Sequence, residues 1–462
     1  MNVKKDSASF RDPSGHVYAL ENRIIRTVTN HAKSNYEFVR DSEIINKITR
    51  KGWIIEAKEI NDYPSELQHQ SICYVLEHPK IPYISYPYEW CFSMLKSAAL
   101  RHLDIQKELL KHGITLSDAS AYNIQFNNSN PVFIDFLSFR RYIDGELWFG
   151  HRQFCEQFLN PLLLSAYVGI PHNAWYRGSL EGITTSDINK LLPFYRKLSW
   201  RVFTNICLPD FLQKKNTDGN KSKSLDDMKL HKAGYAGILE QLSNWIRGLT
   251  PLGISKTTWS DYVNTHSYST SEENSKHSFI KEFTAQTQPE ILFDFGCNTG
   301  EYSESAIEAG AKFVIGYDFD PNALDKAYQR AKNKKLNFLP LYLDAANPSP
   351  GQGWLGKERK SFTERGKADA IIALAFEHHL TIGRNIDLED LIKWLVSIAP
   401  RGIIEFVQKT DPMIQTMLSM REDIFYDYTE ENFESILEKN ARIVKKETIS
   451  ANGRRLYWFD RL

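Results

Sequence analysis

Short apolar runs and amphipathic stretches alternate along the chain after residue 290. The apolar runs ILFDF, FVIGYDF, NFLPLYLDA, ADAIIALAF and GIIEFV are separated by segments with helical periodicity, such as PNALDKAYQRAKN and LEDLIKWLVSIA. Strands that are apolar on both faces and alternate with amphipathic helices are typical of a parallel sheet covered on both sides. The last runs, ARIVKKETI and RRLYWFDR, follow in the order of a hairpin. The pattern predicts an α/β unit on a seven-stranded sheet.

Two polar stretches precede this alternating region. Residues 214–232 (KKNTDGNKSKSLDDMKLHK) have almost nothing to bury and predict an exposed loop or linker. Residues 264–278 (NTHSYSTSEENSKHS) precede a short helical pattern, FIKEFTAQ, that leads into the first strand. We expect a domain boundary between them, near residue 255, with one domain over residues 1–255 and a second over residues 256–462. The length also fits two domains, because one domain commonly has roughly 100–200 residues.

Composition and charge narrow the class of protein. The chain has 57 Lys and Arg residues and 57 Asp and Glu residues, so net charge gives no argument for a nucleic-acid or membrane partner, although a local basic patch stays open. The five cysteines lack metal-ligand spacing and predict neither a zinc site nor a disulfide framework. No apolar run resembles a signal peptide or a membrane span. We expect a soluble, cytoplasmic protein.

The strongest candidate chemistry lies in residues 291–320, ILFDFGCNTGEYSESAIEAGAKFVIGYDFD. Asp294 and a turn with Gly296 and Gly300 follow the first strand, and Asp318 closes the second. In a parallel sheet, ligands bind beyond the carboxyl ends of the strands, where glycine permits close approach and an acidic residue accepts hydrogen bonds from a ribose. Glu301 stands where a dinucleotide pyrophosphate would lie, so its charge repels a phosphate but tolerates a zwitterionic amino-acid tail.

These residues resemble the motifs of class I S-adenosylmethionine-dependent methyltransferases, a family with a Rossmann-like sheet. The resemblance covers about residues 256–462 and implies S-adenosylmethionine as cofactor. It implies that Asp294 and the turn hold the methionine part, that Asp318 holds the ribose, and that Asp344 faces the adenine amino group. The implied cofactor-binding residues are Asp294, Gly296, Cys297, Asn298, Thr299, Gly300, Asp318, Phe319, Asp344 and Ala345. Asn298 replaces a glycine of many members, and asparagine tolerates the left-handed backbone that glycine would adopt.

The fourth motif of this family matches ALAFEHHL, residues 373–380, where a strand ends beside the transferred methyl group. His378 and His379 are candidates for a general base, since an unperturbed histidine pKa of about 6.5 suits removal of a hydroxyl proton. The alternative is that one histidine packs under the adenosine and the other caps the next helix. Glu377 either orients its neighbour or is solvated, and residues 405–411 are expected to border the acceptor pocket.

A second constellation lies in LSDASAYNIQFNNSNPVFIDFLSF, residues 116–139. Asp118 and Asn123 are five positions apart, an apolar strand follows, and Asp135 closes the next strand. The segment resembles the catalytic segment of protein kinases and small-molecule phosphotransferases, and the resemblance extends over about residues 10–210. It implies an α+β, protein-kinase-like domain in which Asp118 acts as the base while Asn123 and Asp135 bind Mg²⁺ together with ATP.

The resemblance to kinases is incomplete. Gly15 is a single glycine where several would cover the phosphates, and no lysine stands out in the expected strand, where Arg23 or Arg26 could replace it. Leu137 replaces the glycine of the D-F-G element. An active kinase-like domain, a degenerate one and an accidental spacing beside a hairpin therefore all stay open.

The two halves together resemble nodulation-type methyltransferases, which occur among glycan-assembly proteins. The resemblance implies O-methylation of a hydroxyl group on a glycan or a small molecule. One alternative is an enzyme that also phosphorylates the glycan, and another is a catalytically silent N-terminal module that binds the acceptor or a partner. A nucleic-acid methyltransferase ranks last, because the chain lacks a basic field and an N-P-P-Y type of motif. The sequence does not indicate an oligomeric state.

Overall fold

The computed structural model of the chain describes residues 4–20, 23–68, 70–217, 229–253, 270–419, 421–450 and 452–462. The chain divides into two units, one of residues 1–254 with 350–361 and one of residues 255–349 with 362–462. In the polar stretch predicted as a linker, helix α10 (Leu208–Thr217) continues to Thr217, and residues 218–228 lie outside the described residues. None of the described helices is long and apolar enough to cross a membrane.

The second unit contains one seven-stranded sheet in the order β12-β11-β10-β13-β14-β16-β15. The first five strands of the unit pair in parallel, and β16 runs antiparallel to both β14 and β15. The predicted seven-stranded α/β sheet with a C-terminal hairpin is confirmed. Its strands are β10 (Ile291–Phe295), β11 (Phe313–Asp318), β12 (Phe338–Tyr342), β13 (Ala370–Ala373), β14 (Arg401–Phe406), β15 (Ala441–Thr448) and β16 (Arg455–Arg461).

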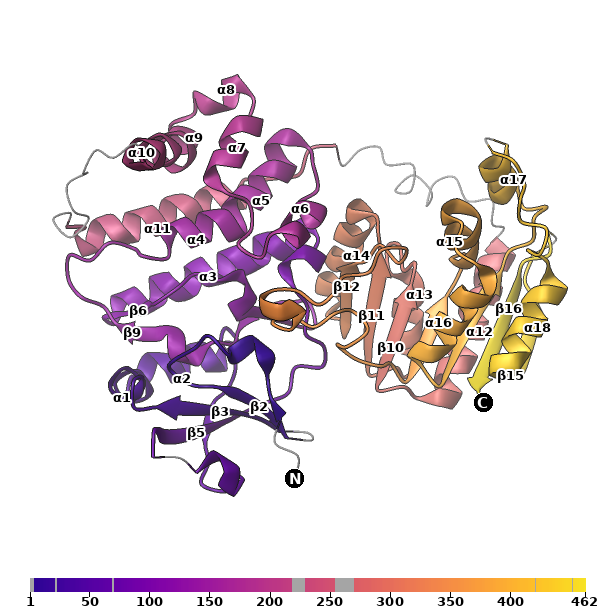
Figure 1. Ribbon diagram of the computed structural model, residues 1–462, viewed down its shortest axis with the longest axis horizontal. Helices are drawn as coiled ribbons and strands as arrows, with labels where there is room; N and C mark the ends of the chain where they lie inside the picture. The colour runs from indigo at the N-terminus through magenta and orange to yellow at the C-terminus, as the bar shows by residue number, and fades with distance from the viewer. Residues whose placement is uncertain are drawn as a thin grey trace. The chain divides into compact units, whose positions relative to one another are not determined.

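Helices lie on both sides of this sheet (Figure 1). From β10 the chain steps outward to β11 and β12, and it then returns to the other side of β10 for β13 and β14. Because crossovers between parallel strands are right-handed, steps in opposite directions place their helices on opposite faces. The reversal beside β10 opens a crevice at the carboxyl ends of β10 and β13, where open α/β sheets bind ligands. The helices are α12 (Thr270–Thr287), α13 (Glu301–Glu308), α14 (Pro321–Lys334), α15 (Glu377–Arg384), α16 (Leu388–Ile398), α17 (Pro412–Leu418) and α18 (Glu430–Asn440).

Helix α12 begins earlier than its apolar residues predict. Residues 270–278 of the polar stretch form its first turns, whereas residues 264–269 lie outside the described residues. Phe279, Ile280 and Phe283 are buried further along the helix. A polar sequence therefore does not mark a linker here, because one helix carries both the polar turns and the packed ones.

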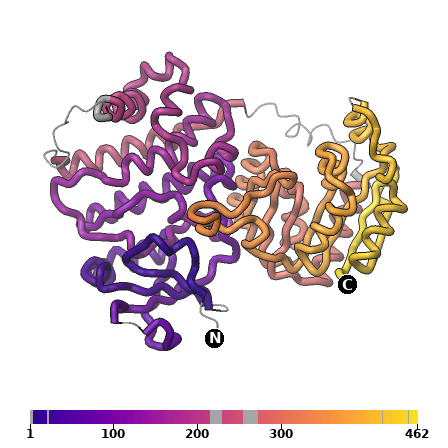
Figure 2. Tube along the Cα trace, viewed as in Figure 1, coloured from indigo at the N-terminus to yellow at the C-terminus, as the bar shows by residue number. Residues whose placement is uncertain are grey.

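The first unit starts with a five-stranded antiparallel sheet in the order β1-β2-β3-β5-β4. Figure 2 shows the chain leaving this indigo sheet for a set of helices coloured purple to magenta. Two short hairpins, β6 with β9 and β7 with β8, follow the long helix α3 (Phe92–Lys111). The strands are β1 (Lys4–Lys5), β2 (Val17–Leu20), β3 (Arg23–Thr29), β4 (Lys58–Glu59), β5 (Ile72–His78), β6 (Ile114–Leu116), β7 (Ile124–Asn127), β8 (Asn130–Phe133) and β9 (Phe139–Arg141). The remaining helices are α1 (Lys33–Arg40), α2 (Glu43–Arg50), α4 (His151–Phe154), α5 (Asn160–Leu163), α6 (Asn173–Gly178), α7 (Thr185–Leu191), α8 (Phe194–Lys197), α9 (Trp200–Val202) and α11 (Lys232–Arg247).

Residues 350–361 belong to the first unit, although they follow β12 in the sequence and fall within the predicted second domain. The guanidinium of Arg359 lies 4.3 Å from the ring centroid of Tyr122. Glu358 Oε2 pairs with Arg11 Nη2 at 3.0 Å, and the Lys360 amide donates to the Tyr86 hydroxyl at 3.0 Å. The first unit is therefore discontinuous in sequence.

Candidate active site

The turn after β10 has the backbone that its glycines predict. Gly296, Asn298 and Gly300 all have positive φ, at 75°, 47° and 81°. The amides of Gly296 and Cys297 donate to the carbonyl of Tyr317 at 2.8 and 3.1 Å, which fixes the turn against β11. A Cβ on Gly300 would lie 2.5 Å from the Phe338 ring, so glycine is required there. The predicted left-handed backbone of Asn298 is confirmed.

Asp294 lies under this turn and is buried in the sheet. Its Oδ2 accepts a hydrogen bond of 2.6 Å from the Ser303 hydroxyl on α13. Burial raises the pKa of Asp294 to about 7, with a smaller contribution from the charge of Asp318. A buried carboxylate of this kind favours a cationic neighbour, because opposite charge offsets the loss of hydration.

Asp318 ends β11, and its carboxylate accepts a hydrogen bond from a backbone amide of the turn. Its Oδ2 accepts from the Asn298 amide at 2.9 Å, and its Oδ1 accepts from the Asp320 amide at 2.9 Å. Burial raises the pKa of Asp318 to about 6, although these backbone donors oppose the shift. The next residue, Phe319, is 47% exposed, so a large apolar surface lies beside this carboxylate.

Asp344 follows β12, the neighbouring strand of the sheet. Its Oδ1 accepts from the Ala346 amide at 3.1 Å, and its Oδ2 lies 3.9 Å from Arg384 Nη2 on α15. Asp344 and Ala345 are both partly buried. The three predicted acidic residues therefore end three adjacent strands, β10, β11 and β12, at the same edge of the sheet.

Glu301 opens helix α13 directly after the turn. Arg330 Nη2 on α14 pairs with Glu301 Oε1 at 2.8 Å, while Arg330 Nε donates to the carbonyl of Thr299 at 2.9 Å. A carboxylate therefore occupies the helix N-terminus at which a dinucleotide would place its phosphates. Thr299 and Cys297 are buried, and burial raises the pKa of the Cys297 thiol well above its usual value.

The segment after β13 brings the two candidate bases together. His378 is buried, its ring centroid lies 4.1 Å from that of His379, and its Nδ1 lies 3.5 Å from Glu377 Oε2. Burial lowers the pKa of His379 well below its usual value, and the neighbouring His378 and Arg454 add to the shift. His379 is therefore uncharged at neutral pH, as a packed ring would be, and the same shift makes it a weaker proton acceptor than an exposed imidazole.

Glu377 is not solvated, so that interpretation of the sequence is wrong. The side chain is fully buried, and its Oε1 accepts from the Val407 amide at 2.9 Å and from the Tyr428 hydroxyl at 2.7 Å. These bonds connect the start of α15 to the end of β14.

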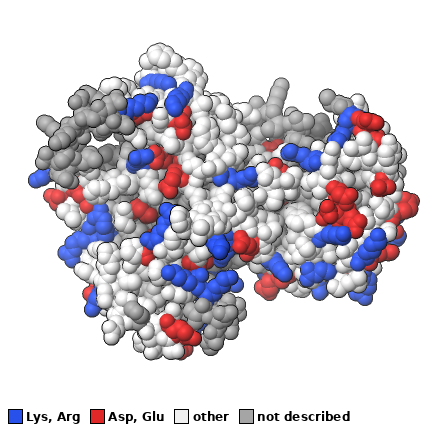
Figure 3. Space-filling view, in the orientation of Figure 1, with Lys and Arg blue, Asp and Glu red and all other residues white. Residues whose placement is uncertain are grey.

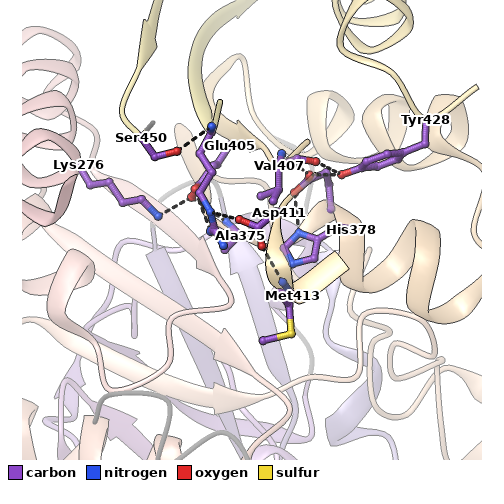
Figure 4. Close-up of polar contacts among 11 residues, drawn as sticks. Lys276, Ala375, His378, Glu405, Val407, Asp411, Met413, Tyr428 and Ser450 are labelled. Atoms are coloured by element: carbon purple, nitrogen blue, oxygen red, sulfur yellow. Dashed lines mark hydrogen bonds and ion pairs between the residues drawn. The ribbon is translucent and has the colours of Figure 1, made fainter. Parts of the chain in front are cut away.

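A buried ionic network, which the sequence reasoning missed, supports the same segment (Figure 4). Glu405 on β14 pairs with Lys276 Nζ on α12 at 2.7 Å, and its Oε2 accepts from the Ala375 amide at 3.0 Å. Arg454 lies 3.4 Å from Glu405 and 2.8 Å from Asp411. Against the effect of burial, Lys276 and Arg454 hold the pKa of Glu405 below its usual value. The single sequence signal was a carboxylate inside the apolar run GIIEFV.

Ala375 adopts a positive φ of 47°, which is unusual for a residue with a side chain. Its amide hydrogen bond to Glu405 helps hold this backbone beside the turn after β10. A Cβ on Gly296 would lie 3.5 Å from the Phe376 ring, so the two segments are in contact. Strained backbone of this kind persists where the surrounding structure fixes it, and it is frequent at functional sites.

In the first unit the three predicted residues also come together. Asn123 Nδ2 donates to Asp118 Oδ1 at 3.0 Å and to Asp135 Oδ2 at 3.3 Å. Arg26 Nη2 on β3 lies 2.5 Å from Asp135 Oδ1 and 2.8 Å from Asp12 Oδ2. Burial, followed by the charge of Asp135, raises the pKa of Asp118 to about 7.

Asn123 and Arg26 hold the carboxylate of Asp135 in this structure. Both oxygens of Asp135 have a partner, Asn123 or Arg26. Within the described residues, no group of three or more His, Cys, Asp or Glu side chains could hold a metal ion. The magnesium role of Asn123 and Asp135 therefore stays a prediction.

The carboxylates of the second unit fit S-adenosylmethionine better than a phosphate ligand. Asp294, Asp318 and Glu301 place negative charge around the turn, where a pyrophosphate would be repelled and an ammonium or sulfonium attracted. Asn298 Oδ1 is buried without a hydrogen-bond partner among the described residues, so an acceptor beside Asp318 is unused. The residues present therefore fit the implied cofactor.

The strand order and the residues at the strand ends define a class: the chain is an S-adenosylmethionine-dependent methyltransferase. No protein-family model matches the chain. It is 45% identical over 457 residues to the nodulation protein NoeA of Rhizobium meliloti (strain 1021), which covers 98% of this chain and 96% of that relative. The chain belongs to the family of this nodulation protein.

Shorter matches and two solved structures were also found, and all of them are methyltransferases by name. The ribosomal protein L11 methyltransferase of Colwellia psychrerythraea (strain 34H) is 42% identical over 62 residues, or 13% of this chain and 21% of the relative. Magnesium protoporphyrin IX methyltransferase from Synechocystis PCC 6803 is 19% identical with a TM-score of 0.31, over 48% of this chain and 95% of that one. The N-methyltransferase NodS from Bradyrhizobium japonicum WM9 is 15% identical with a TM-score of 0.31, over 41% and 87%. Both TM-scores are below 0.5, so neither structure supports a conclusion about this chain.

Proposed function

We propose that this methyltransferase uses the edge of the sheet in the second unit to transfer a methyl group to a hydroxyl of a glycan or a small molecule. The observation that carries the proposal is the set of carboxylates Asp294, Asp318 and Asp344 at the ends of three adjacent strands, around a turn with three positive φ angles. Such an edge offers acceptors for a ribose and an adenine amino group and negative charge for a cation.

S-adenosylmethionine supplies, when bound, an electrophilic methyl group on a sulfonium. Asp318 accepts hydrogen bonds from the ribose hydroxyls, and its position is fixed by the Asn298 and Asp320 amides. Asp294 accepts a hydrogen bond from the Ser303 hydroxyl on α13 and places negative charge near the amino-acid part. Asp344 and Phe319 contact the adenine, the first through its carboxylate and the second through its exposed ring.

Transfer to a hydroxyl needs a group that takes its proton. His379 is held uncharged by its surroundings and can accept that proton, while His378 and Glu377 fix the ring pair at the start of α15. In a displacement at a methyl group most of the rate comes from alignment of the two reactants, and a base adds a smaller factor. We assign His379 the role of base and His378 that of positioning.

The chain belongs to the family of a nodulation protein, and its resemblance to nodulation-type methyltransferases, which occur among glycan-assembly proteins, implies a glycan as the acceptor. The uncharged ring of His379 agrees with a hydroxyl acceptor, whose proton must leave during transfer.

The proposal is tested by isothermal titration of S-adenosylmethionine into wild-type protein and into Asp318→Ala. We expect at least a tenfold loss of affinity, because a charged acceptor for a partly buried ribose is removed, at a cost of about 1.5–3 kcal/mol. Asp427→Ala, at an exposed acidic position, is the matched control and should bind like wild type. Equal affinity of wild type and Asp318→Ala would remove Asp318 from the site.

Nucleotide binding by the first unit is a second candidate function, and a specific observation favours it. Asn123 bridges Asp118 and Asp135, three residues that the kinase resemblance names together. Arg26 reaches the same group from β3, the strand in which the missing lysine is expected. We propose that ATP binds here and that Arg26 leaves Asp135 for a phosphate group.

Titration of magnesium ATP separates this candidate from a silent binding module. The kinase-like candidate requires binding that is lost in Asp135→Asn, and ATP turnover that survives in Asp294→Ala. An unchanged melting temperature at millimolar magnesium ATP, with acceptor binding that requires the first unit, would identify a silent module instead.

A further inference from the structure

Helices α8 to α10 of the first unit expose large apolar side chains over a short stretch of chain. Phe194 is 76% exposed, Leu198 72%, Trp200 71% and Phe211 62%. The complete group, called the apolar patch below, consists of Phe194, Tyr195, Leu198, Trp200, Phe203, Leu208, Phe211 and Leu212. Single exposed apolar residues need no explanation, but a dense group marks an interaction surface.

The patch has a regular helical origin. The helix that starts at Trp200 continues through a π-helical turn (Phe203–Cys207) into α10. A π turn contains one extra residue, so Leu208, Phe211 and Leu212 return to the side of Trp200 and Phe203. Val202, Ile206 and Asp210 are buried on the opposite side. The helix is therefore packed on one face and apolar on its exposed face as well.

Basic residues accompany the apolar patch. Residues 187–214 contain five Lys and Arg residues and two acidic ones; Lys190 pairs with Asp187 at 3.5 Å and Lys214 with Asp210 at 2.6 Å, which leaves Arg196, Lys197 and Arg201 in excess. Asp210 is 3% exposed, and its Oδ2 accepts from Lys214. Figure 3 shows Lys and Arg side chains in blue at the top of the view, where Figure 1 draws α8 and α9, with uncharged residues and a red acidic group beside them. A chain with no net charge thus carries a local positive charge here.

We propose that the apolar patch docks the protein on the surface of a membrane that contains anionic lipids. Exposed Trp, Phe and Leu beside Lys and Arg is the pattern of helices that lie in the plane of a bilayer interface, with apolar rings among the acyl chains and cations at the headgroups. A protein partner would also cover apolar residues, but the excess of cations around the patch specifies a negatively charged surface. The proposal does not depend on the methyl acceptor.

Flotation of the full chain with lipid vesicles tests this surface. The probes are vesicles of phosphatidylcholine and vesicles in which about a third of the lipid is phosphatidylglycerol, an anionic fraction that attracts basic segments. We expect binding to the anionic vesicles and at least about tenfold weaker partition into the neutral ones.

Two double variants separate the apolar part from the charged part. Trp200→Ser with Phe211→Ser should weaken partition at least about tenfold, because two rings no longer insert. Lys197→Glu with Arg201→Glu should weaken it at least about twentyfold, since each cation near the surface contributes about fivefold. All four side chains are at least partly exposed, so the fold should be kept, as checked by circular dichroism.

Matched controls use equivalent changes outside the patch. Ile143→Ser removes a side chain that is 65% exposed, and Lys312→Glu reverses an exposed charge, and neither should change partition. No flotation with anionic vesicles, or equal flotation of wild type and both double variants, would overturn the proposal. A wild-type dimer that becomes monomeric in Trp200→Ser with Phe211→Ser, without vesicle binding, would also overturn it and identify a self-association face.

Discussion

At the scale of single residues, the charge of Asp318 determines when the cofactor can bind. Burial raises its pKa to about 6, so the carboxylate is ionised above that pH and protonated below it. A protonated carboxyl loses acceptor strength toward the ribose. We expect the affinity for S-adenosylmethionine to be constant near pH 8 and to fall about tenfold per pH unit below the pKa.

Titration calorimetry between pH 8 and pH 5 checks this prediction. Asp318→Asn should bind more weakly but with a flatter profile, and the remaining slope should come from Asp294, whose pKa is raised to about 7. Unfolding of the protein at low pH should not cause this loss of affinity for S-adenosylmethionine. A raised carboxyl pKa means that the folded state binds more protons, so these two groups stabilise the ligand-free fold increasingly as pH falls toward about 4. An affinity that is equal at pH 5 and pH 8 would contradict the role of Asp318.

The sequence predicts some of these residues and not others. Asp294 and Asp318 could be placed because each ends an apolar run. The left-handed backbone of Asn298 could be predicted because asparagine is one of the few residues that tolerate a positive φ. Lys276 could not be placed, since it stands in a polar stretch and its partner Glu405 is 129 positions away. A buried ion pair leaves no periodic signal at either residue.

At the scale of secondary-structure elements, Glu405 connects its own strand, β14, to three other parts of the second unit. It holds the Ala375 backbone after β13, pairs with Lys276 on α12 and lies beside Arg454, which follows the hairpin turn between β15 and β16. Glu377 makes the reciprocal connection from α15 to the amide that follows β14. The segment that carries His378 and His379 is thus fixed to the end of β14 by two separate hydrogen bonds.

Glu405→Ala should therefore destabilise the second unit. It leaves two cations in a buried site without their shared carboxylate, and breaking a buried pair in this way costs about 3–5 kcal/mol. Glu447→Ala on β15 is the matched control, because its partner Lys445 is only partly buried and keeps Glu282 as a partner, and ion pairs near the surface contribute about 0–1 kcal/mol. Urea unfolding measures both, and a Glu405→Ala curve that coincides with the control would contradict the network.

Element boundaries follow the apolar pattern where packing dominates. All seven predicted strands of the second unit are present, because each is a short apolar run between helical patterns. Helix α12 starts within a polar stretch, since its first turns use polar side chains, including a buried lysine. Because this lysine is buried in an ion pair, the start of helix α12 could not be predicted from hydrophobicity.

At the scale of the whole molecule, the first unit includes residues 350–361 from the second half of the sequence. Arg359 covers the Tyr122 ring beside Asn123, and Glu358 pairs with Arg11. No pattern of apolar residues indicates such a segment, because its contacts with the rest of the first unit are polar and join residues at least 175 positions apart in sequence. The predicted split at residue 255 follows the polar stretches and does not anticipate it.

Arg359→Ala should lower the stability of the first unit by about 0.5–2 kcal/mol, the range of a cation over an aromatic ring. Lys357→Ala changes an exposed cation of the same segment and is the control. Urea unfolding of the full chain compares the two variants with wild type. Identical midpoints for both variants would show that the segment adds nothing to the first unit.

The most direct measurement for the whole account is a crystal structure of the protein with S-adenosylhomocysteine. We expect the ribose hydroxyls to lie about 2.5–3.0 Å from the Asp318 carboxylate, with the adenine toward Asp344 and the amino-acid part above the turn after β10. A nucleoside bound elsewhere on the second unit, or no binding at all, would contradict the proposed site.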